Sequence, residues 1–125
     1  MKIKIFIENK IKSEFVKDAT SEYMKRISKF AKVEFLPINK YSGTDAIKIS
    51  HTGSDIDSPG LSNLFIDTMM NSSDINFILT DDNTYPSSYD IKLTSLTLSP
   101  DVEVTLLLEQ IYRAFKIMNN ETYHK

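Results

Sequence analysis

Apolar and charged residues alternate at the start of the chain, and apolar residues then recur at helical spacing. Residues 2–8 read KIKIFIE, a period of two that predicts a β-strand. Ser13 can cap a following helix that extends to about residue 30. The apolar positions of this helix recur every three or four residues and should face the sheet. They are Phe15, Ala19, Tyr23, Ile27 and Phe30.

The next two predicted strands are short and close together. Val33 and Phe35 mark the first, and Pro37 indicates an edge position or an early end because proline donates no ladder hydrogen bond. Residues 46–51 mark the second, which Gly53 closes. Only about seven residues join them, whereas a parallel crossover usually needs a dozen or more. Either the two strands are not parallel neighbours, or a helix expected in this kind of fold is missing.

Two later helices begin with a serine followed by a proline. Ser58 and Pro59 predict one start, with serine as the cap, and Ser99, Pro100 and Asp101 predict another. The last helix has the clearest apolar face. That face comprises Val104, Leu107, Leu108, Ile111, Phe115 and Met118, and the earlier helix has Leu61, Leu64, Phe65 and Met69.

Residues 75–79 form an apolar run that predicts a buried fourth strand, and residues 94–98 predict a fifth. Strands that alternate with helices indicate an α/β fold with a mostly parallel sheet. The 125 residues suffice for one domain with its own core, so we expect a single domain over residues 1–125.

Composition narrows the class of protein. The chain has no cysteine, which excludes disulfides, thiolate metal sites and cysteine nucleophiles and fits the cytoplasm. No apolar stretch reaches membrane-spanning length, and the N-terminus has a strand pattern rather than that of a signal peptide. Residues 1–40 carry ten Lys/Arg and five Asp/Glu, whereas residues 41–125 carry five and twelve. A polyanion should therefore prefer the first third of the chain.

Asp81 and Asp82 come just after the predicted fourth strand and Thr80. An α/β protein usually binds its ligand at this end of a strand. Carboxylates at this position can hold Mg²⁺ for phosphate chemistry. The side chains that could supply ligands are His51, Asp55, Asp57, Asp81 and Asp82. No spaced motif supports such a site, and acids in loops are mostly solvated.

The end of the chain, EQIYRAFKIMNNETYHK, resembles the C-terminal signature of the RlmH family of SPOUT methyltransferases. That family combines E-x-x-Y-R-A, here Glu109, Tyr112, Arg113 and Ala114, with a closing Y-H-[KR], here residues 123–125. The segments SEYMKRI (21–27), Lys48 to Leu61 and LTSLTLS (93–99) also resemble family segments. Members use S-adenosylmethionine to methylate a pseudouridine of the large-subunit ribosomal RNA.

The resemblance implies a SPOUT α/β knot, with a mostly parallel sheet, a C-terminal trefoil knot and a long C-terminal helix. It also implies a homodimer packed through that helix, S-adenosylmethionine in the knot loops, and ribosomal RNA or the ribosome as partner. The positions implied to bind the cofactor are Ile49, Thr80, Asp81, Thr94, Ser95, Leu96, Thr97, Leu98 and Ser99.

The resemblance implies that Arg113, Tyr123 and His124 are catalytic, because the family tail reaches back toward the site. Transfer to a ring nitrogen requires loss of its proton, so His124 could act as the base and Arg113 could stabilise the anionic acceptor. Apart from the resemblance, a terminal histidine is usually a solvated residue, and Arg113 can simply pair with Glu109 one turn away.

The chain departs from the family in the cofactor loop. The family's paired glycines fall on Thr80 and Asp81, and no glycine follows them. Since glycine permits close approach of the backbone to a ligand, side chains should fill part of the cofactor space here. The family's Pro-His pair is Ser99-Pro100, and an arginine of the last helix is Val104. Two hypotheses stay open: a working methyltransferase, or a non-catalytic knotted dimer that binds RNA, the ribosome or a protein.

Overall fold

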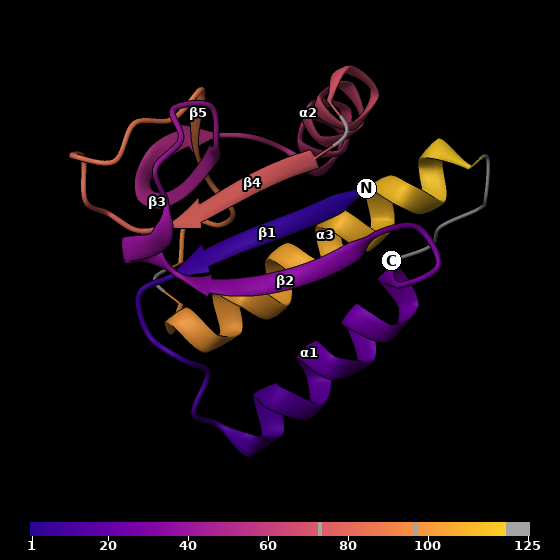
Figure 1. Ribbon diagram of the computed structural model, residues 1–125, viewed down its shortest axis with the longest axis horizontal. Coiled ribbons are helices and arrows are strands. Elements are labelled where there is room, and N and C mark those ends of the chain that lie inside the picture. Colours follow the sequence, from indigo (N-terminus) through magenta and orange to yellow (C-terminus); the bar gives the residue numbers. More distant parts are fainter. Residues whose placement is uncertain (73, 97, 120–125) are drawn as a thin grey trace.

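The computed structural model describes residues 1–72, 74–96 and 98–119, which form an α/β fold with a parallel sheet (Figure 1). Within these ranges the elements follow one another in this order: β1 (Lys2–Ile7), α1 (Glu14–Ile27), β2 (Lys32–Pro37), the short 3₁₀ helix η1 (Ile38–Lys40), β3 (Ile47–Asp55), α2 (Ser58–Asn71), β4 (Asp74–Leu79), β5 (Tyr89–Lys92) and α3 (Pro100–Met118).

The strands form one five-stranded sheet in the order β2-β1-β4-β3-β5, and each described pair is parallel. The predicted α/β class with a mostly parallel sheet is thus confirmed, whereas the knot stays a prediction. β2, which ends at Pro37, lies at an edge of the sheet, as its proline indicated. β1 and β4 lie between β2 and β3. The link between β2 and β3 can therefore be short, because these strands are not parallel neighbours.

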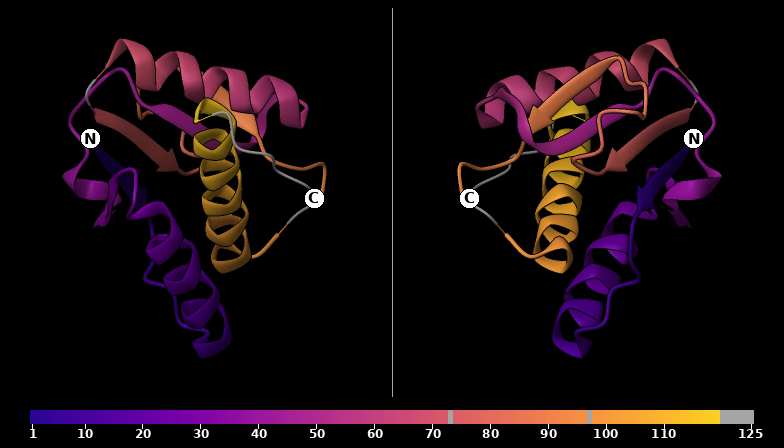
Figure 2. Two further views of the ribbon diagram at one scale, coloured as in Figure 1. Left: turned by 90° about the vertical axis from the view of Figure 1, so that its right-hand side faces the viewer. Right: turned by 90° about the vertical axis from the view of Figure 1, so that its left-hand side faces the viewer.

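The pleat of the strands divides the core between the two faces of the sheet. Ile5 of β1 and Phe77 of β4 belong to the main core, which also contains buried residues of α1, α2 and α3. Figures 1 and 2 show α3 running behind the sheet beside α1. The next residues along each strand, Phe6 and Ile78, form a smaller cluster with Tyr41 on the opposite face. The three helices therefore cover one face, and loop side chains cover part of the other.

Stacked and edge-on aromatic pairs join the helices to each other and to the sheet. The rings of Phe65 in α2 and Phe77 in β4 meet edge-on, with centroids 5.1 Å apart. Phe30, just after α1, stacks on Phe115 of α3 at 5.0 Å. Such pairs add about 0.5–1.5 kcal/mol beyond the burial of their apolar area.

Three details of the predicted elements are wrong. Phe15 was expected to face the sheet, but it is 85% exposed because it lies in the first turn of α1, which projects away from the strands (Figure 1). The cap of α2 is Asp57, whose carboxylate accepts the N–H of Gly60, and Ser58 is the first helical residue. The fifth strand is β5 rather than residues 94–98, since Asp90 pairs with Lys48 and accepts a hydrogen bond from Ser50.

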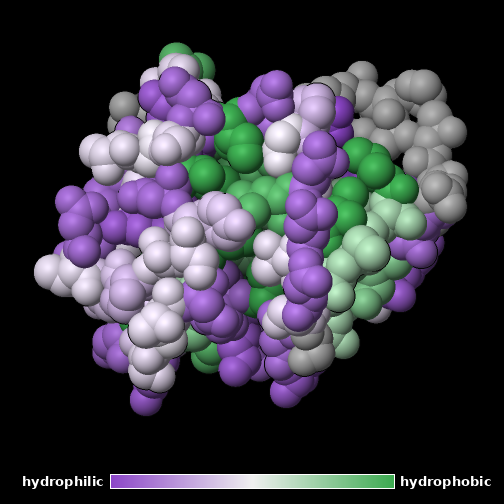
Figure 3. Space-filling view, turned by 90° about the horizontal axis from the view of Figure 1, so that it is seen from above, coloured by the Kyte–Doolittle hydropathy of each residue, from purple (hydrophilic) through white to green (hydrophobic). Residues whose placement is uncertain are grey.

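The side of the molecule on which α2 lies exposes apolar surface among polar residues (Figure 3). Met70 near the end of α2 is 73% exposed. None of the helices in the described ranges has the length and apolar content needed to cross a membrane.

β3 bends sharply where it passes β5. The pairing of the two strands is interrupted between Ile49 and Ser54, and Gly53 lies against the backbone of Ile91. A Cβ atom at Gly53 would lie only 2.4 Å from the carbonyl carbon of Ile91. Only glycine can occupy this position without moving one strand away from the other.

We expect Gly53→Ala to lower the free energy of unfolding by about 1–3 kcal/mol, as overpacking generally does. Chemical denaturation of wild type and variant measures the difference. Gly43→Ala is the matched control, because its Cβ would lie 3.3 Å from a side-chain atom of Tyr41 rather than 2.4 Å from backbone. Equal effects of the two substitutions would contradict the close approach described at Gly53.

Candidate active site

A pocket opens at the carboxyl edge of the sheet, between the ends of β1 and β4, the middle of β3 and the start of α3. Parallel strands place their carboxyl ends together, and this edge is where α/β sheets usually bind ligands. The pocket has a volume of about 160 Å³. It is lined by Ile7, Glu8, Asn9, Ile11, Ile49, His51, Leu79, Thr80, Asp81, Pro100, Asp101, Glu103 and Val104.

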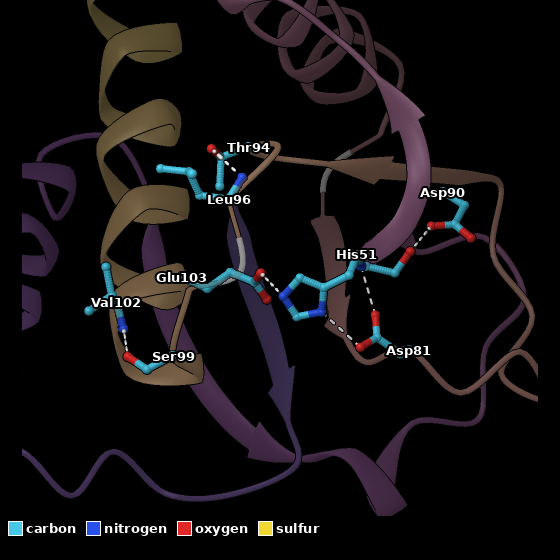
Figure 4. A network of polar contacts seen from close by, with 9 residues as sticks. His51, Asp81, Asp90, Thr94, Leu96, Ser99, Val102 and Glu103 are labelled. Atoms are coloured by element: carbon cyan, nitrogen blue, oxygen red, sulfur yellow. Dashed lines mark hydrogen bonds and ion pairs between the residues drawn. The ribbon is translucent and has the colours of Figure 1, made fainter.

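His51 stands between two carboxylates at this pocket (Figure 4). Asp81 accepts the main-chain N–H of His51 at 2.7 Å with Oδ1, and its Oδ2 lies 2.8 Å from Nδ1 of the imidazole. On the other side of the ring, Nε2 lies 3.5 Å from Oε2 of Glu103. The histidine therefore links β3, the loop after β4 and the start of α3, which are elements that enclose the pocket.

The three groups shift one another's proton affinities. The hydrogen bond that the imidazole donates to Asp81 raises the pKa of His51 above 6.5, and the charge of Glu103 adds to that rise. The same hydrogen bond, with the main-chain bond from His51, lowers the pKa of Asp81. Burial raises the pKa of Glu103, which is 8% exposed. The site therefore combines an ionised carboxylate, a histidine that titrates above its usual range and a carboxyl group that retains its proton more readily.

Side chains rather than glycines hold the loop that follows β4. Lys48 is buried, and its ammonium donates to the carbonyl of Asp82 at 2.9 Å and to Oδ1 of Asn83 at 3.3 Å. On the same face of the sheet, the hydroxyl of Tyr41 donates to the carbonyl of Pro86 at 2.8 Å. These bonds fix both ends of the loop against the sheet.

The cofactor positions implied by the resemblance are brought together only in part. Ile49, Thr80 and Asp81 line the pocket. Ser99 instead caps α3 by accepting the N–H of Val102, and Leu98 lines a separate hollow. Thr94, Ser95 and Leu96 are not among the residues that line the pocket, and Thr97 lies outside the described residues.

Of the catalytic residues implied by the resemblance, only Arg113 is described, and it does not line the pocket. Arg113 is ten residues beyond Glu103 on α3, which corresponds to roughly 15 Å along the helix axis. Tyr123 and His124 lie outside the described residues. A tail contribution from a second copy of the chain stays a prediction.

Sequence reasoning did not assign His51 or Glu103 to a catalytic site. His51 was considered only as a magnesium ligand, and Glu103 was not singled out. In the described ranges, no group of three His, Cys, Asp or Glu side chains is arranged to hold a metal ion, so the magnesium hypothesis finds no support there. The pair of acids that begins with Asp81, after a buried strand, was the one signal in the sequence that pointed to this site.

Comparisons with known proteins agree with this architecture. A family described as "Predicted SPOUT methyltransferase" matches residues 38–124. A protein named "Ribosomal RNA large subunit methyltransferase H" from Dictyoglomus thermophilum is 33% identical, with 99% of each chain covered. Proteins of the same name from Ruminiclostridium cellulolyticum and Mycoplasma mycoides subsp. mycoides are 29% and 30% identical, with both chains fully covered.

The contact between His51 and Asp81 predicts a pH-dependent stability. A histidine whose pKa is raised on folding contributes stability that is fully present below 6.5 and is lost as the pH rises through the raised value. We therefore expect His51→Gln to destabilise the fold at about pH 6 and to match wild type at about pH 9. The difference should stay below about 1 kcal/mol because the pair is partly exposed.

Thermal unfolding of both proteins across this pH range measures the effect. Asp81→Asn is the matched variant, because it removes the contact between His51 and Asp81 from the other side. It should flatten the dependence of stability on pH in the same way. Stability curves that run parallel for wild type and His51→Gln would show that the contact does not form in solution.

Proposed function

This chain belongs to the RlmH family of SPOUT methyltransferases, and on that premise we propose that it methylates large-subunit ribosomal RNA with S-adenosylmethionine in the cytoplasm. The observation that carries the proposal is the pocket at the carboxyl edge of the sheet. It joins Ile49, Thr80 and Asp81, three of the positions that the family resemblance assigns to the cofactor. The name of the Dictyoglomus relative supplies the class of RNA.

The residues of the pocket suit the chemistry of this cofactor. Ile49, Leu79 and Val104 offer apolar walls for a purine ring, and the carboxylate of Asp101 suits a ligand with sulfonium and ammonium charges. When bound, the cofactor supplies an electrophilic methyl group. Small-molecule sites usually measure about 300–1,000 Å³, so this pocket encloses only part of such a ligand. We propose that the remainder lies along residues 94–99, next to Pro100 at the rim.

RNA would meet the basic part of the chain. Residues 1–40 carry ten of the fifteen Lys/Arg residues, among them Lys10 and Lys12 in the segment between β1 and α1. This segment adjoins the pocket, which Asn9 and Ile11 help to line. Because phosphate contacts release counterions, binding should weaken steeply as the salt concentration rises.

We further propose a homodimer that packs through α3. An apolar hollow of about 310 Å³ lies between α1 and α3, lined by Tyr23, Leu98, Val102, Thr105, Leu106 and Glu109. Val102 is 43% exposed although it lies on the same helix as the main core residues. A second copy would cover this surface, and it would also bring a second C-terminal tail near the first protomer.

A test of the cofactor proposal is calorimetric titration of the purified protein with S-adenosylmethionine. We expect a micromolar dissociation constant, equivalent to about −8 kcal/mol, and a higher melting temperature at excess ligand. Asp81→Gly should bind at least as tightly, because it restores a bare backbone beside the cofactor. The matched control is Asp82→Gly at the next residue, which does not line the pocket.

A folded protein that neither binds S-adenosylmethionine nor transfers a methyl group to ribosomes would contradict the proposed enzyme. That outcome would favour the non-catalytic dimer, an alternative motivated by the side chains of Thr80 and Asp81 at the family's glycine positions. Binding of RNA or ribosomes by the same protein would then identify its partner.

A substitution that places a charged side chain in the hollow between α1 and α3 tests the proposed dimer. We expect Leu106→Glu to give a monomer by size-exclusion chromatography with light scattering, because a dimer would bury the carboxylate. Met70→Glu introduces the same charge at an exposed apolar residue of α2 and should leave the mass unchanged. A wild-type protein that is itself monomeric at micromolar concentration would refute the proposed dimer.

A further inference from the structure

We propose that His51, oriented by Asp81, is the catalytic base that takes the proton from the acceptor nitrogen of the RNA. The inference rests on the proposed methyl transfer, and it assigns the base to the pocket rather than to the C-terminal tail. Three features of the pocket support this proposal: the fixed orientation of the imidazole, the position of Nε2 on the side of the ring away from Asp81, and the two carboxylates that stabilise the protonated ring.

Asp81 fixes both the orientation and the tautomer of the imidazole. Its two oxygens accept from the main-chain N–H of His51, at 2.7 Å, and from the ring nitrogen Nδ1, at 2.8 Å. An ionised carboxylate can only accept hydrogen bonds, so the proton of neutral His51 lies on Nδ1. The lone pair is therefore on Nε2, as in other bases that a carboxylate orients.

Nε2 is placed to accept a proton from a ligand in the pocket. It lies on the side of the ring that faces α3, and its 3.5 Å separation from Glu103 is longer than the usual hydrogen bond (Figure 4). The side chain of His51 is 38% exposed and lines the pocket, so an acceptor nucleotide can reach it. No described residue is hydrogen-bonded to Nε2 at a shorter distance.

The surrounding charges favour proton uptake. Asp81 and Glu103 lie on opposite sides of the ring, so the imidazolium that forms is stabilised from both directions. Glu8 and Asp101 line the same pocket, and the carboxylate of Asp101 accepts the main-chain N–H groups of Lys12 and Ser13. The charge of Lys48 acts on Asp81 in addition to that of His51, and Lys48 lies on the opposite face of β3.

The proposed step is balanced. The N–H bond of the acceptor breaks, and its proton passes to Nε2 of His51. The electron pair left on nitrogen forms the new N–CH₃ bond, while the bond between methyl carbon and sulfur breaks and its electrons stay on sulfur, giving a neutral thioether. Imidazolium then returns the proton to solvent. A base with a pKa near the working pH is the most effective for this role.

The test compares wild type, His51→Gln and Asp81→Asn in methyl transfer to assembled ribosomes and to free ribosomal RNA at a series of pH values. We expect His51→Gln to lower the rate at least 100-fold, as loss of a general base does, and to remove the fall in rate toward acid pH. Asp81→Asn should keep that fall and move it to lower pH. Asp82→Asn is the control, since its carboxylate bonds to Thr84 and makes no described contact with His51.

Two further measurements separate catalysis from folding and binding. NMR titration of the imidazole should give a pKa for His51 above 6.5 in wild type and a lower value in Asp81→Asn, with or without activity. Calorimetry should show that His51→Gln still binds S-adenosylmethionine, so that its loss of rate is not a loss of cofactor. Added imidazole should restore part of the rate of His51→Ala.

Three outcomes would overturn the proposal. Wild-type rates and pH profile in His51→Gln would exclude His51 as the base. If His124→Gln removes the fall in rate toward acid pH and His51→Gln keeps it, the base belongs to the C-terminal tail. An inactive wild type that does not bind the cofactor would remove the proposed function as a whole, and this result is distinguished from the others because it precedes any comparison of variants.

Discussion

The parallel pairing of β1, β4 and β3 is the constraint on which the rest of the structure depends. β1 and β4 end at the same edge of the sheet, and the pairing of β3 with β4 ends there too, so the residues after Ile7, Ile49 and Leu79 meet although they are far apart in the sequence. The first turn of α3, with Pro100 and Glu103, lies at this edge and closes the pocket on the face of the sheet that the helices cover. Each feature of the candidate site follows from that convergence.

The loop after β4 shows how a site can keep its place in a fold and change its construction. The family resemblance implies glycines where Thr80 and Asp81 stand, and glycine lets the backbone approach a ligand. Here the carboxylate of Asp81 instead binds His51, and buried Lys48 holds the next two residues. The loop loses space for a ligand but acquires an ionised group that orients a histidine. The replacement therefore changes the chemistry available at the pocket as well as its volume.

Two surfaces connect the pocket to larger partners. The basic segment between β1 and α1 borders the pocket and suits an approaching polyanion, whereas most acidic residues lie in the later part of the chain. The hollow between α1 and α3 lies on a different side of α3 and suits a second copy. The linings of the pocket and of the hollow share no residue, so the proposed dimer and the proposed catalysis would not compete for the same side chains.

The sequence by itself determined the class of the fold and the elements with strong periodicity. The apolar stripes of α2 and α3, the edge position of β2 and the buried strand before Asp81 were all predicted, because burial imposes a local spacing on apolar residues. Tertiary structure alone decided that Tyr89–Lys92 rather than residues 94–98 forms the last strand, since a strand needs a partner edge and β3 supplies it. It also decided that His51, Asp81 and Glu103 meet, because no local spacing relates side chains from two strand ends and a helix start.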